Sequence, residues 1–128
     1  MGDLTLDFNR SEFRCKCGCG KDNISMALVN KLQQLRVNYG KPLKINSGCR
    51  CIKHNAAVGG KSNSAHICEG KEGEAADIHI ESAEQLWDLV DLCFSLKIFK
   101  RIGIGTTLLH VDVSITNPTP RIWPYTDR

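Results

Sequence analysis

The stretch Ser64–Ile80 constrains the fold of this chain more than any other segment. It places His66 in a polar, glycine-rich loop and then runs through Gly73 and two alanines to Asp77, which opens an apolar segment. A neutral imidazole and a carboxylate are both good zinc ligands, but a catalytic zinc site takes three protein ligands. The fold therefore has to bring a third ligand to this stretch from elsewhere, and we expect it to be His110.

The size and charge of the chain limit the possible classes of protein. A chain of 128 residues is the size of one domain, so we treat residues 1–128 as a single unit. Its formal net charge is only +3, and it has no run of about five or more basic residues, which argues against a nucleic-acid partner. No segment approaches the roughly 18 consecutive apolar residues of a membrane span. We expect a monomeric domain with no nucleic-acid partner and no membrane span.

Hydrophobic periodicity predicts an α+β fold. Apolar residues at helical spacing predict two main helices, over residues 25–39 and from 83 to about 97. Alternating apolar and polar residues predict four short strands, over residues 43–46, 75–80, 101–104 and 108–113. The short link between the last two strands favours an antiparallel hairpin. We therefore expect a small, mainly antiparallel sheet, with a long loop over residues 47–64 and a polar tail over residues 114–128.

The spacing of histidine and aspartate suggests how a metal site is assembled. His110 and Asp112 lie two residues apart on one predicted strand, so both side chains point to the same face. If the strand that begins near Asp77 is its neighbour, Asp77 and His110 converge, and His66 reaches them from the loop. Three protein ligands with an open position are the catalytic arrangement of zinc, which generates a nucleophilic water. The alternative is that these histidines bind no metal, since most histidines in strands are ordinary residues of the sheet.

Several short motifs together resemble a known family. In chain order they are Ser47-Gly48-Cys49-Arg50, Ser64-Ala65-His66, Gly73-Glu74-Ala75-Ala76-Asp77-Ile78, Gly103-Ile104-Gly105 and Leu109-His110-Val111-Asp112-Val113. This series resembles the zinc D-alanyl-D-alanine carboxypeptidase family of peptidoglycan peptidases, whose fold is shared with the Hedgehog signalling domain. The resemblance extends from Phe8 to Trp123. It implies that fold and a zinc-dependent peptidase that cleaves peptidoglycan stem peptides.

The resemblance also implies roles for individual residues. It assigns one catalytic zinc ion to His66, Asp77 and His110. It assigns Arg50 to a substrate carboxylate, a task that suits the fork of N–H donors on a guanidinium group. The alternative for Arg50 is an arginine that braces its own loop.

The sequence departs from the family pattern around the predicted site. His66 and Asp77 are eleven residues apart, because residues 68–71 form an insertion that we expect to reshape the rim of the site. Thr107 stands where several branches of the family have an acidic general base, so another group has to activate the water. Asp112 is our first candidate for this catalytic role, and its alternative is a group that orients His110. Weaker candidates are Glu69, Glu72 and Glu74.

The chain has seven cysteines, of which we expect Cys93 to be a core thiol and Cys68 to be accessible in its loop. The other five form two tight groups: Cys15, Cys17 and Cys19, and then Cys49 and Cys51. Three states remain open for them: a second, structural zinc site, a disulfide that ties the N-terminal segment to the Arg50 loop, and reduced thiols.

These observations leave three hypotheses for function. The first is a murein carboxypeptidase or endopeptidase, and the second is a catalytically inactive zinc-containing domain that binds the cell wall or a partner. The third is a nucleic-acid module built on a cysteine zinc site. The first ten residues show no signal peptide, so we expect a protein made in the cytoplasm that acts on the cell wall or in the periplasm. Release by a phage-type lysis route would reconcile the two locations.

Overall fold

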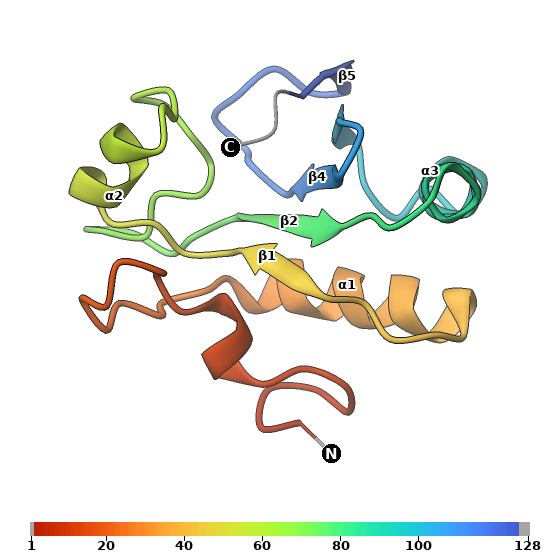
Figure 1. Ribbon diagram of the computed structural model, residues 1–128, viewed down its shortest axis with the longest axis horizontal. Helices are drawn as coiled ribbons and strands as arrows, with labels where there is room; N and C mark the ends of the chain where they lie inside the picture. The colour runs from red at the N-terminus through yellow and green to blue at the C-terminus, as the bar shows by residue number, and fades with distance from the viewer. Residues whose placement is uncertain (1, 126–128) are drawn as a thin grey trace.

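The computed structural model describes residues 2–125 and confirms the predicted α+β class (Figure 1). The elements in chain order are η1 (Arg10–Phe13, a 3-10 helix), α1 (Met26–Tyr39), β1 (Ile45–Ser47), α2 (Ile52–Ala57), β2 (Ala75–His79), α3 (Ala83–Ser95), β3 (Arg101–Ile104), β4 (Leu108–Asp112) and β5 (Arg121–Pro124). The strands form one sheet in the order β1-β2-β4-β3-β5. Within the described residues, every pair is antiparallel except β3 with β5, so the sheet is mainly antiparallel as predicted.

The helix α1 forms where the sequence predicts it and covers one face of the sheet. Ser25 caps its start by accepting a hydrogen bond from the Leu28 amide at 3.3 Å. Gly40 ends it with φ of +79°, a left-handed conformation that glycine adopts without strain. Leu28, Leu32 and Leu35 are buried in the hydrophobic core. Figure 1 shows α1 running beneath β1 and β2, so the core lies between this helix and the sheet.

Alternation along the strands separates the core from a polar face. In β4, Leu109 and Val111 belong to the core, whereas His110 and Asp112 point to the opposite face. The strands β2 and β4 are neighbours, and Asp77 lies directly across from His110. We expected these two side chains to converge if their strands were neighbours, and the pairing of β2 with β4 confirms this.

Two elements that the sequence did not predict cover the polar face. The helix α2 lies within the predicted loop, and β5 lies within the predicted tail. In Figure 1 both lie away from α1: α2 stands beside the sheet, and β5 forms its edge next to β3. The helix α2 is too short for a helical period to be visible in the sequence. The strand β5 is a short edge strand whose pairing depends on a partner distant in the chain. Because this face is covered, all of β4 is buried.

The N-terminal segment is attached to the core by its aromatic residues. Phe8 and Phe13 are buried, with their ring centroids 5.9 Å apart. The Cys49 amide donates a hydrogen bond of 2.8 Å to the Phe13 carbonyl, which links this segment to the turn before α2. Cys93 is buried as expected, but the prediction that Cys68 is accessible was wrong. Cys68 is only 4% exposed because it packs into the core beside Cys49.

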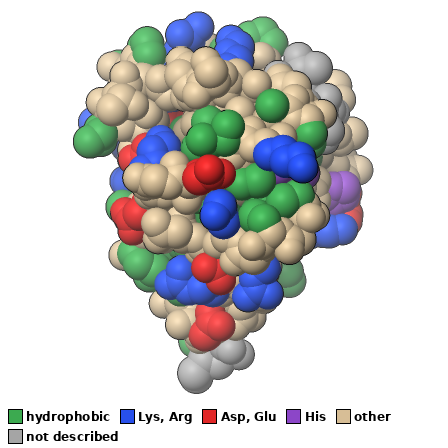
Figure 2. Space-filling model, turned by 90° about the vertical axis from the view of Figure 1, so that its left-hand side faces the viewer, with side chains coloured by type: hydrophobic (Ala, Val, Ile, Leu, Met, Phe, Trp, Pro, Cys, Tyr) green, Lys and Arg blue, Asp and Glu red, His purple; other side chains and the backbone are tan. Residues whose placement is uncertain are grey.

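The outer surface adds two observations. Within residues 2–125, no helix combines the length and the apolar character that crossing a membrane requires. Figure 2 shows the face at the left of Figure 1, where basic and acidic side chains are interspersed around a small hydrophobic patch. Charges of both signs therefore share this face.

Candidate metal centre

The three predicted ligands meet at the centre of the polar face. His66 comes from the loop before β2, Asp77 from β2 and His110 from β4. The His66 Nε2 atom is 3.2 Å from Asp77 Oδ1, and His110 Nδ1 is 3.0 Å from the same oxygen. One ligand atom from each residue lies within 4.8 Å of the other two, and all three side chains are buried. The fold thus gathers a donor set that zinc uses.

The His66 ring is held with one nitrogen directed at Asp77. Its Nδ1 donates to the Gly48 carbonyl at 2.7 Å, which leaves Nε2 without a proton and available as a ligand. Burial lowers the pKa of His66 below its ordinary value, so the ring is neutral at neutral pH. A metal requires this neutral form.

The His110 ring is held in the opposite sense. Its Nε2 donates to Asp112 Oδ2 at 2.7 Å, and its Nδ1 faces Asp77. Burial alone would lower the pKa of His110, but hydrogen bonds to Asp112 and Asp77 outweigh it and raise the pKa. This position therefore favours a positive charge, which a metal ion would supply in place of the proton.

Asp77 is ionised and braced from its outer side. Burial would raise the pKa of Asp77, but the two histidines outweigh it and hold the pKa well below its usual range. Its Oδ2 accepts hydrogen bonds of 3.2 Å from Arg50 and from the Tyr125 hydroxyl, so Oδ1 faces the histidines. Each of the three residues thus has one atom fixed by the protein and one atom directed inward. A zinc ion fits this arrangement.

Asp112 is held by three donors. Its Oδ2 accepts from His110, and its Oδ1 accepts from Arg101 Nε at 2.7 Å and from the Ser114 amide at 3.1 Å. Burial would raise the pKa of Asp112, but the hydrogen bond with His110 outweighs it and lowers the pKa. These contacts match the orienting role that the sequence left open. The catalytic role as a general base stays a prediction.

Arg50 is buried against the same cluster. Its guanidinium donates to Ser47 Oγ at 3.1 Å, Asn55 Oδ1 at 3.3 Å and Asp77 Oδ2 at 3.2 Å. The bracing contacts of the alternative hypothesis are therefore present. The Tyr125 hydroxyl is a further hydrogen-bond neighbour of Arg50. Arg50 also lines the cavity beside the site, and its substrate-binding role stays a prediction.

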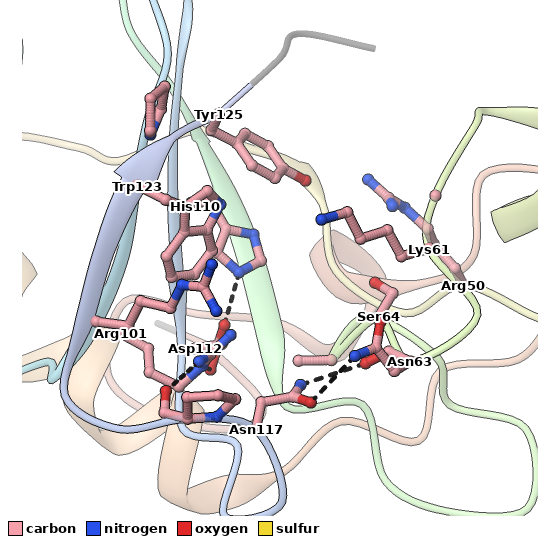
Figure 3. A pocket seen from close by; sticks show the side chains of 15 residues that line it. Arg50, Lys61, Asn63, Ser64, Arg101, His110, Asp112, Asn117, Trp123 and Tyr125 are labelled. Atoms are coloured by element: carbon pink, nitrogen blue, oxygen red, sulfur yellow. Dashed lines mark hydrogen bonds and ion pairs between the residues drawn. The ribbon is translucent and has the colours of Figure 1, made fainter.

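A cavity of about 240 Å³ opens beside His110. Figure 3 shows its two walls. One wall carries Arg101, His110, Asp112, Asn117, Trp123 and Tyr125, and the other carries Arg50, Lys61, Asn63 and Ser64. Asn117 donates to the Asn63 carbonyl at 3.2 Å and joins the walls at one end. Of the three predicted ligands, His110 lines this cavity.

The sequence comparison decides the family. The sequence model described as peptidase M15 matches residues 6–114. This chain belongs to the peptidase M15 family. The match confirms the family resemblance read from the motifs, and it makes the chain a metallopeptidase whose family implies zinc at the histidine–aspartate cluster. No curated protein matches the chain.

Several contacts in this M15 peptidase could not be seen in the sequence. The Tyr125 hydroxyl reaches Asp77, and burial raises the pKa of Tyr125 to about 12, so it stays a proton donor at neutral pH. The Trp123 ring lies 5.4 Å from the His110 ring, and the Arg101 guanidinium lies 4.8 Å above Trp123. A tryptophan within a polar segment was the one visible signal that this tail packs onto the site.

The remaining candidates lie outside the cavity. Among the described residues that line it, Asp112 is the sole carboxylate, and Glu69, Glu72 and Glu74 are absent from its walls. Thr107 does not line it either. Residues 68–71 do not line this cavity either, and their effect on the rim of the site stays a prediction. This insertion packs against the start of α2, where Glu69 accepts a hydrogen bond of 3.1 Å from the Ile52 amide.

Proposed function

We propose that this M15 peptidase cleaves peptide bonds in the stem peptides of peptidoglycan. The reaction is that of a D-Ala-D-Ala carboxypeptidase or of a murein endopeptidase of the phage-endolysin type. The convergence of His66, Asp77 and His110 beside an open cavity carries the proposal. Such an enzyme is made in the cytoplasm and acts on the cell wall or in the periplasm, because its substrate is there.

The ligand atoms of the proposed zinc ion follow from the hydrogen bonds on their outer sides. They are His66 Nε2, Asp77 Oδ1 and His110 Nδ1. When bound there, zinc polarises a carbonyl and lowers the pKa of a coordinated water. Hydrolysis adds one water across the amide: the C–N bond breaks, the carbonyl carbon keeps the hydroxyl group and the leaving nitrogen takes the proton.

The walls of the cavity suit an anionic peptide. Arg50, Lys61, Arg101 and Arg121 all line it, and one carboxylate of the described residues, Asp112, offsets them. A stem peptide that ends in D-alanine carries a free carboxylate. We assign that carboxylate to Arg50, with Lys61 on the same wall as a second cation.

One observation favours a second candidate, an inactive zinc-containing domain that binds the cell wall or a partner. Both oxygens of Asp112 already accept hydrogen bonds, and it is the one carboxylate of the described cavity lining. A hydrolytic site needs a base for its water. The same fold without such a base would bind murein and leave it intact.

Digestion of purified murein separates the two candidates. The zinc-loaded protein is incubated with murein, and the soluble products are identified by mass spectrometry. We expect release of D-alanine or of cleaved cross-bridge peptides by the wild type, and loss of release in His66→Ala. His79→Ala is the matched control, because His79 lies on β2 outside the ligand set. Zinc binding without cleavage of any murein would overturn the peptidase proposal in favour of the binding domain.

A further inference from the structure

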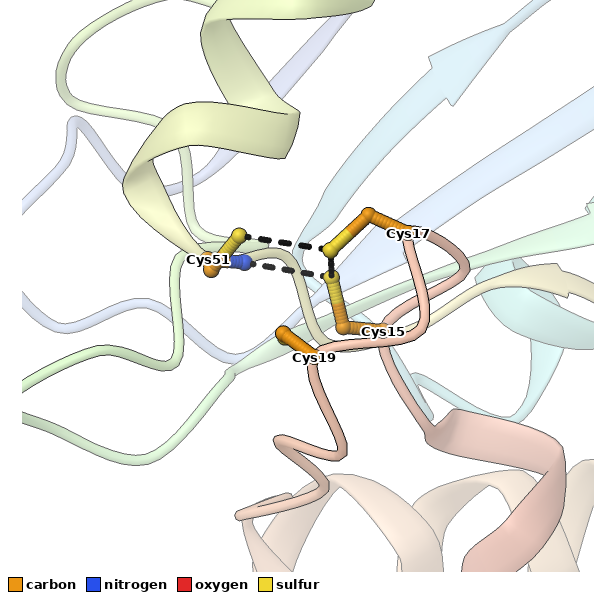
Figure 4. Close-up of side chains that lie close together, drawn as sticks. All are labelled: Cys15, Cys17, Cys19 and Cys51. Carbon is orange, nitrogen blue, oxygen red and sulfur yellow. Dashed lines mark hydrogen bonds between the residues drawn. The ribbon is translucent and has the colours of Figure 1, made fainter.

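A second group of metal-ligating side chains lies away from the histidine cluster. Cys15, Cys17 and Cys19 come from the N-terminal segment, and Cys51 is the residue that caps the start of α2 (Figure 4). Their four sulfur atoms lie within 4.8 Å of one another. The sequence had left Cys49 as a further member of this group. The structure places Cys49 beside Cys68 instead, and the four-sulfur group does not include it.

The distances between sulfur atoms match a metal tetrahedron. Zinc binds thiolate sulfur at about 2.3 Å, which places the sulfurs of a regular tetrahedron about 3.8 Å apart. Cys15 Sγ is 3.5 Å from Cys17 Sγ, and Cys17 Sγ is 3.7 Å from Cys51 Sγ. A disulfide requires about 2.05 Å between its sulfur atoms. All seven cysteines are unpaired in the structure.

Backbone amides point at all four sulfurs. The Cys51 amide donates to Cys15 Sγ at 3.4 Å, and the His54 amide donates to Cys51 Sγ at 3.3 Å. The amides of Cys19 and Lys21 lie close to the sulfurs of Cys17 and Cys19, respectively, and act to lower the pKa of those thiols. N–H donors stabilise the negative charge of thiolates, and such outer-shell hydrogen bonds orient the ligands of metal sites.

We propose that Cys15, Cys17, Cys19 and Cys51 bind a second zinc ion with a structural role. Four cysteine ligands fill the tetrahedral coordination of zinc and leave no open position for a substrate. Cys17 and Cys19 are exposed, so an ion can reach the site from solvent, whereas Cys15 and Cys51 are buried and anchor it to the fold.

The position of this site explains what it would stabilise. Cys51 directly follows the turn that carries Gly48 and Arg50, and these two residues hold His66 and Asp77 in place. The three N-terminal cysteines begin two residues after Phe13, whose carbonyl accepts a hydrogen bond from the Cys49 amide. A metal ion that joins the two segments therefore fixes the turn on which the histidine–aspartate cluster depends.

Metal counting tests the proposal without any measurement of activity. The full chain is purified under reducing conditions with zinc, and bound metal is measured by elemental analysis. We expect two zinc ions per chain in the wild type and one in His66→Ala/His110→Ala. We also expect one in Cys17→Ser/Cys51→Ser, and two in the matched control Cys49→Ala. If the histidine cluster binds no zinc, the wild type should still hold one ion, which only the cysteine substitutions remove. The metal counts therefore test the two proposed sites independently.

Cobalt substitution identifies the ligands of the remaining ion. In His66→Ala/His110→Ala, bound Co²⁺ should show the near-ultraviolet charge-transfer absorption of thiolate ligands. Cys19 is exposed, so Cys19→Ser leaves the core packing intact. In this variant the affinity of the ion should fall by at least about tenfold, since loss of an outer-shell partner alone costs that much. A wild-type metal count unaffected by the cysteine substitutions would overturn the proposal. So would a disulfide among these cysteines, detected by mass spectrometry in protein kept reduced.

Discussion

Asp112 illustrates how the neighbours of a side chain limit its chemistry. A carboxylate on the same face as the last ligand has the right position for a general base. In the folded protein, however, its oxygens accept from His110, Arg101 and the Ser114 amide. A carboxylate in this position fixes the tautomer of a ligating histidine and strengthens it as a ligand. We therefore expect Asp112 to act on the substrate through His110.

Replacing Asp112 by asparagine separates the two roles. If Asp112 orients His110, Asp112→Asn should weaken zinc binding by about 10- to 100-fold, and saturating zinc should restore most of the activity. Zinc affinity is measured by competition with a chromophoric chelator, and kcat is measured at saturating zinc. Unchanged zinc affinity with a loss of kcat of about 10²- to 10⁴-fold would show instead that Asp112 is the base.

Replacing Arg50 by lysine tests the proposed substrate contact. Lysine keeps the charge but cannot reproduce the fork of donors that holds Ser47, Asn55 and Asp77. We expect KM for a peptide with a free carboxylate to rise by about tenfold or more, and KM for its amidated analogue to change far less. Arg36→Lys on α1 is the matched control, because Arg36 pairs with Asp7 far from the site. Equal changes in KM for both peptides would show that Arg50 only braces the loop.

Among the elements, the pairing of β2 with β4 sets the distance between two of the ligands. Backbone hydrogen bonds hold Asp77 across from His110, so their separation depends on the sheet and not on flexible loops. The third ligand depends on the turn before α2, because the Gly48 carbonyl fixes the His66 ring. The same turn packs against Phe13 of η1 through Gly48.

Gly48→Ala tests how tightly this turn is packed. A Cβ atom on Gly48 would lie 2.9 Å from the Phe13 Cα and Cβ atoms, so either the turn or η1 must move. We expect a loss of about 1–3 kcal/mol in the free energy of unfolding, together with weaker zinc binding. Denaturant unfolding and zinc competition measure these two quantities. Wild-type values for both would contradict the packing described for this turn.

The helix α3 provides a test of burial through thiol reactivity. Burial raises the pKa of Cys93 to about 12. A raised thiol pKa means fewer thiolates at a given pH, so at pH 8 only about one Cys93 in 10⁴ would be in the reactive form. We expect iodoacetamide to leave Cys93 unmodified in the folded protein at pH 8 and to modify it after denaturation, as read by peptide mass mapping. Rapid modification of Cys93 in the native protein would contradict its place in the core.

The whole molecule divides its stabilising contacts between the two faces of the sheet. The hydrophobic core lies on the α1 side, whereas the other face buries two histidines, two aspartates and two arginines, Arg50 and Arg101. Buried charges and polar groups are costly unless they are paired or bind a metal. We therefore expect bound metal to stabilise this face in particular.

Removal of metal should lower the melting temperature. A ligand at 100 times its Kd adds about 2.7 kcal/mol to the stability of the folded state, which for a domain of this size corresponds to roughly 8–14 °C. Calorimetry with and without EDTA measures the change. His66→Ala/His110→Ala should show a smaller response, because it has lost one of the two proposed ions. An unchanged melting temperature after complete zinc removal would show that no bound metal supports the fold.

Local patterns in the sequence predicted the elements that depend on residues close together in the chain. The apolar spacing and the cap residues Ser25 and Gly40 specified α1, and period-two alternation placed His110 on the face opposite the core. The predicted hairpin of β3 and β4 formed because its link is short. The motif order also indicated the family that the sequence model confirms.

Contacts between residues distant in the chain decided the features that local sequence patterns cannot predict. The strand β5 exists because it pairs with β3, and Tyr125 reaches Asp77 because β5 lies there. Cys68 is buried because it packs beside Cys49, and Cys51 joins three cysteines more than thirty residues earlier in the chain. The chain order gives the residue types of each site, but the contacts of Arg50 with Asp77 and of Cys51 with Cys17 join residues that are distant in sequence. Their roles follow from the neighbours that folding brings to them.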